Sequence, residues 1–163
     1  MRFRCTTCEE DHDGLPELAF DAPATYYGVP EAERGARAFL NSDLCVVDDE
    51  HYFVRAVLLL PIRGTDEDYG YGVWASLSKP HFDRYLALFD GDPPPGEGPW
   101  FAWLGNSVPG YPETHALKTR LHLRQGGDRP CLELEPTDHP LAVHQREGIE
   151  LAELVERLRD RLH

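Results

Sequence analysis

The sequence has no long hydrophobic run. Its longest uninterrupted apolar stretch, Ala56 to Leu60, is far shorter than the ~20 residues that a membrane-spanning helix needs. The first residues, MRFRCTTCEEDHDG, also contain no apolar segment of the kind found at the centre of a secretory signal. We therefore expect a cytoplasmic protein that does not act at a membrane, and whose cysteines stay reduced.

Positive charge is scarce. The chain has 16 Lys and Arg residues against 29 Asp and Glu, which gives a formal net charge of −13. Nucleic acids and anionic lipid surfaces are recognised largely through Lys and Arg, so a strongly negative protein repels both. Neither is expected as a partner, whereas a basic protein is favoured.

Several motifs of common enzymes are missing. There is no P-loop, no GxGxxG after a strand, no GxSxG and no HExxH, which removes the usual sequence arguments for an enzyme without excluding one. The 163 residues, 41% of them hydrophobic, fit one domain spanning 1–163 that can bury a core without disulfides.

Strands are predicted where short runs of β-branched, aromatic and leucine residues are bounded by turns. Such runs occupy residues 44–47, 51–62, 71–78 and about 100–106. The clearest alternation lies in ALKTRLHLR, where one face carries Leu117, Thr119, Leu121 and Leu123 and the other carries Lys118, Arg120, His122 and Arg124. CLELE, residues 131–135, repeats the alternation after a turn. Together the two segments predict a hairpin with one buried face.

Helices are predicted between and after these strands. The segments are PEAERGARAFL from Pro30, an amphipathic stretch that follows Ser78, residues 140–147, and roughly the last fifteen residues. GDPPPGEGP, residues 91–99, is the best candidate for a mobile loop. We expect an α+β fold with a mainly antiparallel sheet, an inserted helix, C-terminal helices and an irregular N-terminal segment over 1–30.

The sharpest chemical motif is CxxC followed by a histidine. Cys5, Cys8 and His12 supply the sulfur and nitrogen ligands that Zn²⁺ prefers, and structural zinc sites have four ligands. The fourth ligand would come from elsewhere in the chain, with Cys45, His51 and His139 as candidates. Such a site would staple the irregular first thirty residues.

Two other interpretations of Cys5 and Cys8 stay open. They could form a redox pair, although thioredoxin-like pairs lie where a strand meets a helix N-terminus, and the acidic residues after Cys8 would raise the thiol pKa. They could also be two reduced surface thiols. The remaining cysteines, Cys45 and Cys131, are expected to pack as small hydrophobic residues.

A second cluster of ionisable residues lies in EPTDHPLAVHQRE. Its members are Glu135, Asp138, His139, His144 and Glu147. They could form a metal site or the general base of an enzyme. Alternatively, Thr137 or Asp138 caps the helix that begins near Pro140.

Two surface features also have alternative interpretations. The basic stripe of the predicted hairpin could bind an anion, but Glu133 and Glu135 share its face and are expected to pair with it. The aromatic residues could line a pocket, but at strand-like spacing they are expected in the core. These residues are Trp74, Trp100, Phe101 and Trp103.

Several segments together resemble a known bacterial family. They are the CxxC with its histidine, SDLCVVDDEHYFVRA, YGYGVWASLS, PGYPET and LELEPTDHPLAVHQREGI. The chain is identified by them as a member of the domain of unknown function 2199 family. The resemblance implies a bacterial origin and a compact standalone domain. This sequence has Glu9 where the family often has a glycine, which would ease a tight metal-binding turn.

The function favoured by the sequence is a small acidic, non-enzymatic binding or regulatory domain with a structural zinc. The first alternative is an enzyme, such as a metal-assisted hydrolase, with a site around Asp138 and His139. The second is a thiol redox protein that acts through Cys5 and Cys8.

Overall fold

The computed structural model describes residues 2–4 and 9–159. The strands in this part of the chain are β1 (Arg2–Arg4), β2 (Asp11–Asp13), β3 (Leu18–Ala19), β4 (Ala38–Leu40), β5 (Leu44–Val47), β6 (His51–Pro61), β7 (Asp68–Leu77), β8 (Trp100–Leu104), β9 (Lys118–His122) and β10 (Cys131–Leu134). The helices are α1 (Ala24–Tyr27), the 3-10 helix η1 (Glu31–Glu33), α2 (Arg34–Arg37), α3 (Lys79–Leu88), α4 (Pro140–Glu147) and α5 (Leu151–Arg157). In the regions described, none of these helices has the length and apolar character needed to cross a membrane.

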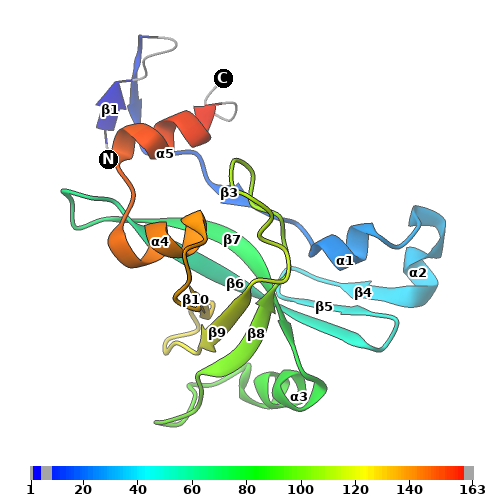
Figure 1. Cartoon of the computed structure of the whole chain (residues 1–163). Coiled ribbons are helices and arrows are strands. Elements are labelled where there is room, and N and C mark those ends of the chain that lie inside the picture. The colour runs from blue at the N-terminus through cyan, green and yellow to red at the C-terminus, as the bar shows by residue number, and fades with distance from the viewer. Residues whose placement is uncertain (1, 5–8, 160–163) are drawn as a thin grey trace.

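Five strands form a small closed barrel (Figure 1). β6 and β7 make a long antiparallel hairpin, and β8, β9 and β10 follow as further antiparallel neighbours. A meander of five strands ends in the direction in which it began, so β10 meets β6 in parallel, with Cys131 opposite Val57. The mainly antiparallel sheet expected from the sequence is confirmed, and the closure of that sheet into a barrel is an addition.

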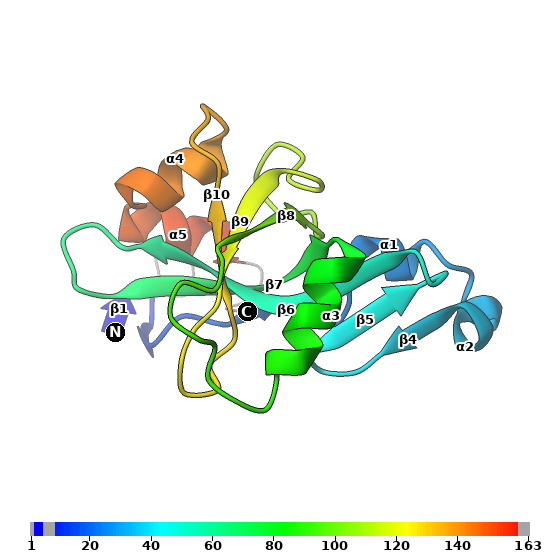
Figure 2. The ribbon, with the colours of Figure 1, turned by 90° about the horizontal axis from the view of Figure 1, so that it is seen from below.

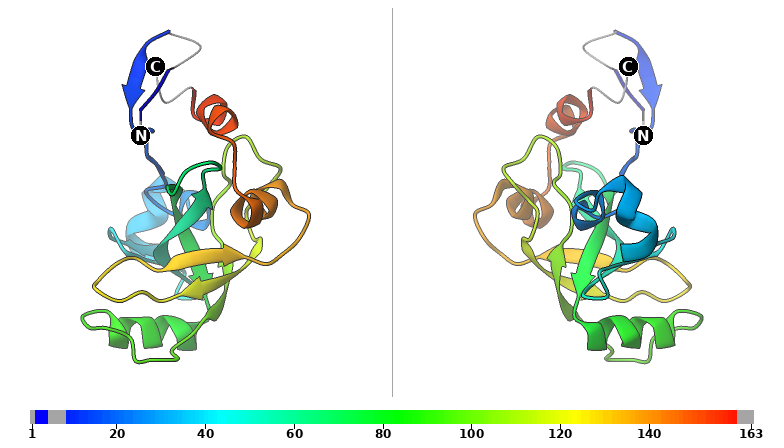
Figure 3. Two further views of the ribbon diagram at one scale, coloured as in Figure 1. Left: turned by 90° about the vertical axis from the view of Figure 1, so that its left-hand side faces the viewer. Right: turned by 90° about the vertical axis from the view of Figure 1, so that its right-hand side faces the viewer.

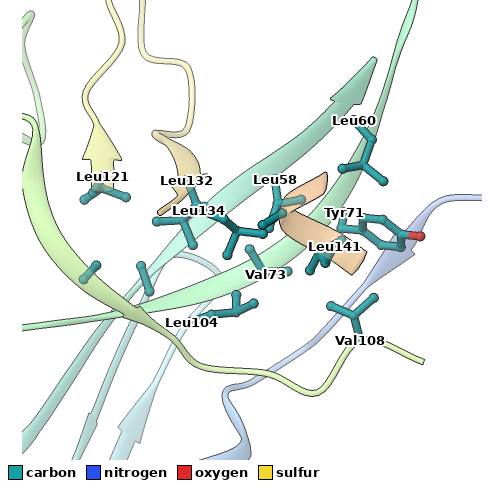
Figure 4. Packing of buried hydrophobic residues seen from close by; sticks show 14 of the residues in the cluster. Leu58, Leu60, Tyr71, Val73, Leu104, Val108, Leu121, Leu132, Leu134 and Leu141 are labelled. Atoms are coloured by element: carbon teal, nitrogen blue, oxygen red, sulfur yellow. The ribbon is translucent and has the colours of Figure 1, made fainter. Parts of the chain in front are cut away.

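The barrel interior is filled by alternate side chains of all five strands. Figure 4 shows one residue from each strand pointing into this core, and Leu141 of α4 covers it. The five residues are Leu58, Val73, Leu104, Leu121 and Leu132. Small barrels of this kind have room for side chains only, so the interior is a packed core and not a ligand cavity.

β6 and β7 continue beyond the barrel and carry a second, smaller core on their outer face. β5 and β4 extend the sheet from β6, and β3 adds to β7 in parallel. Phe53 and Trp74 alternate with barrel-facing neighbours and pack against Cys45 and Val47. Val29, which follows α1, closes this core, and Figure 1 shows α1 alongside this part of the sheet.

Residues 2–4 and 9–40 contain more regular structure than the sequence indicated. The segment expected to be irregular contains β1, β2, β3 and α1, and the helix expected from Pro30 ends at Arg37. β4 takes the place of its last three residues because Ala38 and Leu40 pair with Val47 and Cys45 of β5. Tertiary strand pairing here outweighs the local helical pattern.

The predicted helices after Ser78 and at 140–147 are confirmed. Of the helix expected over the last fifteen residues, the structure has α5 at Leu151–Arg157, and residues 160–163, with the predicted apolar Leu162, lie outside the described residues. Ser78 caps α3 by accepting a hydrogen bond from the backbone N–H of His81. α4 occupies the expected residues, α5 buries Leu154, and Leu158, which follows α5, is buried as well. Figures 1 and 3 show α4 and α5 at one end of the barrel and α3 at the other.

Candidate functional site

The predicted zinc ligands lie only partly within the described residues. Cys5 and Cys8 are outside them, and His12 is a residue of β2 whose backbone pairs with Phe3 of β1. In the chain segments described, no three His, Cys, Asp or Glu side chains gather closely enough to hold a metal ion. The zinc site therefore stays a prediction.

The candidate fourth ligands lie in different surroundings. Cys45 is buried in β5, within the smaller core, and burial raises the pKa of its thiol to about 12. His51 is exposed at the start of β6. Figures 1 and 2 place the β1–β2 hairpin and β5 at opposite sides of the molecule, which disfavours Cys45 as a partner of the N-terminal cysteines.

His139 is used by the fold on both ring nitrogens. Its Nδ1 accepts a hydrogen bond of 3.1 Å from the backbone N–H of Leu141, which caps α4. Its Nε2 lies 3.1 Å from the carbonyl oxygen of Pro112 and 3.2 Å from that of Glu113. Two carbonyls can only accept, so Nε2 carries the proton. The expected helix cap is present, but His139 provides it rather than Thr137 or Asp138.

The residues around His139 do not assemble a catalytic group. Thr137 accepts from the backbone N–H of His139 at 3.2 Å, and its carbonyl accepts from Arg146 at 2.8 Å. Asp138 is exposed, and His144 contacts a different part of the molecule. A ring whose two nitrogens are committed to backbone groups cannot also serve as a general base without losing the cap. The contacts at His139 thus favour a structural role.

His144 belongs to a polar network at the α4–α5 end of the barrel. Its Nδ1 lies 2.8 Å from Oη of Tyr111, and its Nε2 lies 3.4 Å from a carboxylate oxygen of Glu153. Arg157 binds the other oxygen of Glu153 at 3.0 Å and stacks over the Tyr111 ring at 4.0 Å from its centroid. The network joins the loop before β9 to α4 and α5. Sequence reasoning named His144 but missed Tyr111, whose only signal was its place in PGYPET.

The tyrosines of this network stay protonated. Burial raises the pKa of Tyr111, and it also raises that of its neighbour Tyr71, which lies in the barrel core. A phenol that resists ionisation is a poor base or nucleophile. The contacts instead fix one loop to two helices, so the network acts as a clamp.

The outer face of β8 and β9 presents a different chemistry. Phe101 and Trp103 alternate with the buried Ala102, and their side chains are 44% and 41% exposed. Their rings meet edge to face at a centroid distance of 4.8 Å. In the β8–β9 register Phe101 lies opposite Arg120, and Trp103 lies opposite Lys118. We call these four residues the aromatic–basic face.

The cations of this face are not neutralised as the sequence suggested. Glu133 lies opposite Arg120 in the β9–β10 register, but its carboxylate is 3.1 Å from Nε2 of His122. Among the described residues, neither Arg120 nor Lys118 has a carboxylate within ion-pair distance. Their charges are therefore available to a ligand.

A hollow of about 360 Å³ adjoins the aromatic pair. It is lined by Ser76, Leu77, Ser78, His81, Phe101 and Trp103. His81 is held against Trp100 by stacking, with ring centroids 4.9 Å apart and planes 8° apart. The prediction that the aromatic residues are core is confirmed for Trp74 and Trp100 and wrong for Phe101 and Trp103. In β8, successive side chains point to opposite faces of the sheet, so Trp100 lies on the buried face and Phe101 and Trp103 do not share a single core position with it. Phe101 and Trp103 are the exposed members of this strand.

The fold and these surfaces define an α+β domain built on a closed barrel with a packed interior. The chain belongs to the DUF2199 family of uncharacterized proteins conserved in bacteria, whose model matches residues 4–149. The resemblance read from the sequence is thereby confirmed. No curated protein and no solved structure matches the chain.

Proposed function

We propose that this protein is a cytoplasmic binding or regulatory domain whose contact surface is the aromatic–basic face. The observation that carries the proposal is the exposure of Phe101 and Trp103 in register with two cations that lack carboxylate partners in the described chain. Large aromatic side chains that group on a surface mark interaction sites more often than single exposed ones. Trp and Arg are also the residues that contribute most to binding energy at protein interfaces.

The partner suited to this face is a protein segment that carries carboxylates beside an apolar side chain. The carboxylates would pair with Lys118 and Arg120, and the apolar group would enter the hollow beside Phe101 and Trp103. The net charge of −13 favours a partner that is basic overall. At physiological ionic strength, however, exposed charges further apart than about 8 Å are largely screened. Contacts at the face are therefore governed by its own cations.

Tryptophan fluorescence provides the test. Of the three tryptophans, Trp74 and Trp100 are buried, so a ligand on the face changes mainly the emission of Trp103. A short peptide of Glu and Leu residues should change this emission, and a peptide of Lys and Leu residues should not. Arg120→Gln should weaken binding of the acidic peptide about tenfold, equal to about 1.4 kcal/mol. Arg159→Gln removes the same charge two residues after the end of α5. This variant should leave the binding of the acidic peptide unchanged.

Two results would contradict the proposal. If only the basic peptide bound, the overall negative charge of the protein, and not the aromatic–basic face, would select the partner. Equal effects of Arg120→Gln and Arg159→Gln would show that the peptide responds to total charge. Melting temperatures of both variants separate lost binding from lost folding.

A structural zinc at Cys5, Cys8 and His12 is a second part of the proposal. β1 and β2 pair with Arg4 opposite Asp11, so six residues connect the two strands, and both cysteines belong to that short connection. This proximity along the chain supports a shared metal, and His12 follows in β2. The redox alternative has less support, because a strand and not a helix follows the connection.

A further inference from the structure

A second hollow, unrelated to the aromatic–basic face, lies between α3, the α3–β8 loop and the β9–β10 turn. Its volume is about 320 Å³, within the range typical of small-molecule sites. Figure 2 shows the α3–β8 loop and the β9–β10 turn side by side below the barrel. The apolar part of the lining includes Tyr85, Leu88, Phe89 and Leu123, and the charged part consists of Asp43, Arg124, Asp128 and Arg129.

Contacts between the surrounding segments hold the walls of this hollow in place. Gln125 donates a hydrogen bond of 2.9 Å to the carbonyl of Pro93, and the backbone N–H of Gly126 donates one of 2.9 Å to Asp92. On the other side, Arg84 of α3 forms an ion pair with Glu97. The loop that the sequence marked as mobile is therefore tied to both the turn and the helix. A site whose walls are held before binding loses less entropy when a ligand enters.

Some of the charged side chains around the hollow have an ion-pair partner and others do not. Arg129 pairs with Asp43 at 3.4 Å. Arg124 uses its Nε to donate to the carbonyl of Arg129, and its two terminal nitrogens have no partner in the described part of the chain. Asp128 has no ion-pair partner among the described residues. One guanidinium end and one carboxylate are thus available beside an apolar floor.

We infer that this hollow binds a small carboxylic acid with an apolar body. The carboxylate would pair with the terminal nitrogens of Arg124, a geometry that guanidinium groups favour. The apolar body would lie on Leu88 and Phe89, whose side chain is exposed in this structure. The Tyr85 hydroxyl lines the hollow and, like any phenol at neutral pH, is protonated and available as a donor. An α-amino group on the same ligand would face Asp128.

Isothermal titration calorimetry on the full chain tests this inference with three probes. 3-Phenylpropanoate should bind, and 3-phenylpropanamide, which lacks the charge, should bind at least about tenfold more weakly. The third probe, phenylalanine, shows whether the carboxylate that binds belongs to an amino acid or to a simple acid without an amino group. If phenylalanine binds more tightly than 3-phenylpropanoate and Asp128→Asn removes the difference, the site takes amino acids. Equal or weaker binding assigns it to simple acids.

Variants locate the binding. Arg124→Gln should weaken 3-phenylpropanoate binding at least about tenfold. Arg159→Gln, which removes an exposed cation that lines neither hollow, should not. Leu88→Trp should block binding by filling the hollow, and its melting temperature checks that the fold is kept. Absence of binding at millimolar concentration, or binding that Arg124→Gln and Leu88→Trp both leave unchanged, would overturn the inference.

Discussion

Tyr111 and His144 are joined by a hydrogen bond of 2.8 Å between Oη and Nδ1, although they are 33 positions apart in the chain. The bond ties the loop before β9 to α4, and Glu153 and Arg157 extend it to α5. The loop before β9, α4 and α5 are not part of the hydrogen-bonded barrel. Their attachment to it therefore depends on this network as well as on the buried side chains of Leu141 and Leu154.

The first prediction concerns this bond. Tyr111→Phe removes the hydroxyl and leaves a partly buried imidazole nitrogen unpaired, so it should lower the free energy of unfolding by about 1–3 kcal/mol. Tyr27→Phe, at a side chain that is 53% exposed, is the matched control and should have little effect. Urea unfolding measures both.

A double-mutant cycle with His144→Gln tests whether the effect belongs to the pair. If Tyr111 and His144 act through their bond, the double variant should lose less stability than the sum of the two single variants. Strictly additive losses would mean that each side chain contributes through other contacts.

The second prediction concerns Gln145, which lies where β10 and β6 share a single register pair and whose Nε2 is 3.5 Å from the carbonyl oxygen of Leu59 in β6. Its Oε1 accepts from the backbone N–H of Leu134 at 2.7 Å, and its Nε2 donates to the carbonyl of Leu132 at 2.8 Å. Gln145→Ala leaves both backbone groups unpaired and should cost about 1–3 kcal/mol. Hydrogen exchange of the Leu134 amide should accelerate.

Gln125→Ala provides the comparison, because Gln125 is exposed and makes one hydrogen bond to Pro93. It should be near neutral for global stability. Equal losses in the two variants would show that Gln145 has no special role at the barrel seam.

The third prediction concerns Cys45. Burial raises the pKa of its thiol to about 12, so almost none of it is the reactive thiolate at neutral pH. A thiol reagent such as DTNB should modify Cys45 only after denaturation, and Cys45→Ser should remove that late phase. Rapid loss of the Cys45 thiol in the folded protein would contradict the burial of β5.

The fourth prediction concerns alkaline pH. Burial raises the pKa of Tyr85 to about 12, whereas the ordinary value, which the unfolded chain has, is 10.0. Between these values the folded protein keeps a proton that the unfolded chain releases, so raising the pH favours unfolding. Stability should be constant in this respect below pH 10.0 and fall above it. Tyrosinate absorbance follows the ionisation of the tyrosines, and urea unfolding at the same pH values follows the loss of stability.

A Tyr85→Phe variant should lose part of this alkaline sensitivity. Tyr71 and Tyr111, whose pKa values burial also raises, account for a remainder. If Tyr85→Phe and the unchanged protein lose stability equally above pH 10.0, Tyr85 is not the group that titrates.

The fifth prediction concerns zinc. Protein purified without a His tag or added metal should contain about one zinc per chain, as a single four-ligand site would. Cys8→Ser should release the metal and lower the melting temperature. Cys131→Ser, at a half-buried cysteine of β10, should keep it. The proposal would be wrong if the unchanged protein contained no metal and Cys8→Ser had the same melting temperature.

Local patterns predicted much of the fold because they matched the final packing. The alternation around Leu121 and Leu132 became the β9–β10 hairpin, and the spacing after Ser78 became α3. The strand β4 was missed because Ala38 to Leu40 become extended only by pairing with β5, a contact that no short window contains. Barrel closure was missed for a similar reason, since it depends on one parallel pair between Cys131 and Val57.

The candidate sites were harder to predict than the strands. Arg120 was expected to be neutralised by a cross-strand glutamate, yet Glu133 turns to His122. Rotamer choice decides between such partners, and spacing does not encode it. Tyr111 was missed because its bond to His144 depends on how a loop folds over α4.

The hairpin of β6 and β7 has its side chains in both hydrophobic cores, with Val54 and Val73 in the barrel and Phe53 and Trp74 outside it. Neither core can be dismantled without removing neighbouring residues of the same strands from the other. We therefore expect one cooperative unfolding transition with no stable fragment on either side, so that proteolysis at the hairpin would destroy the whole domain and not divide it.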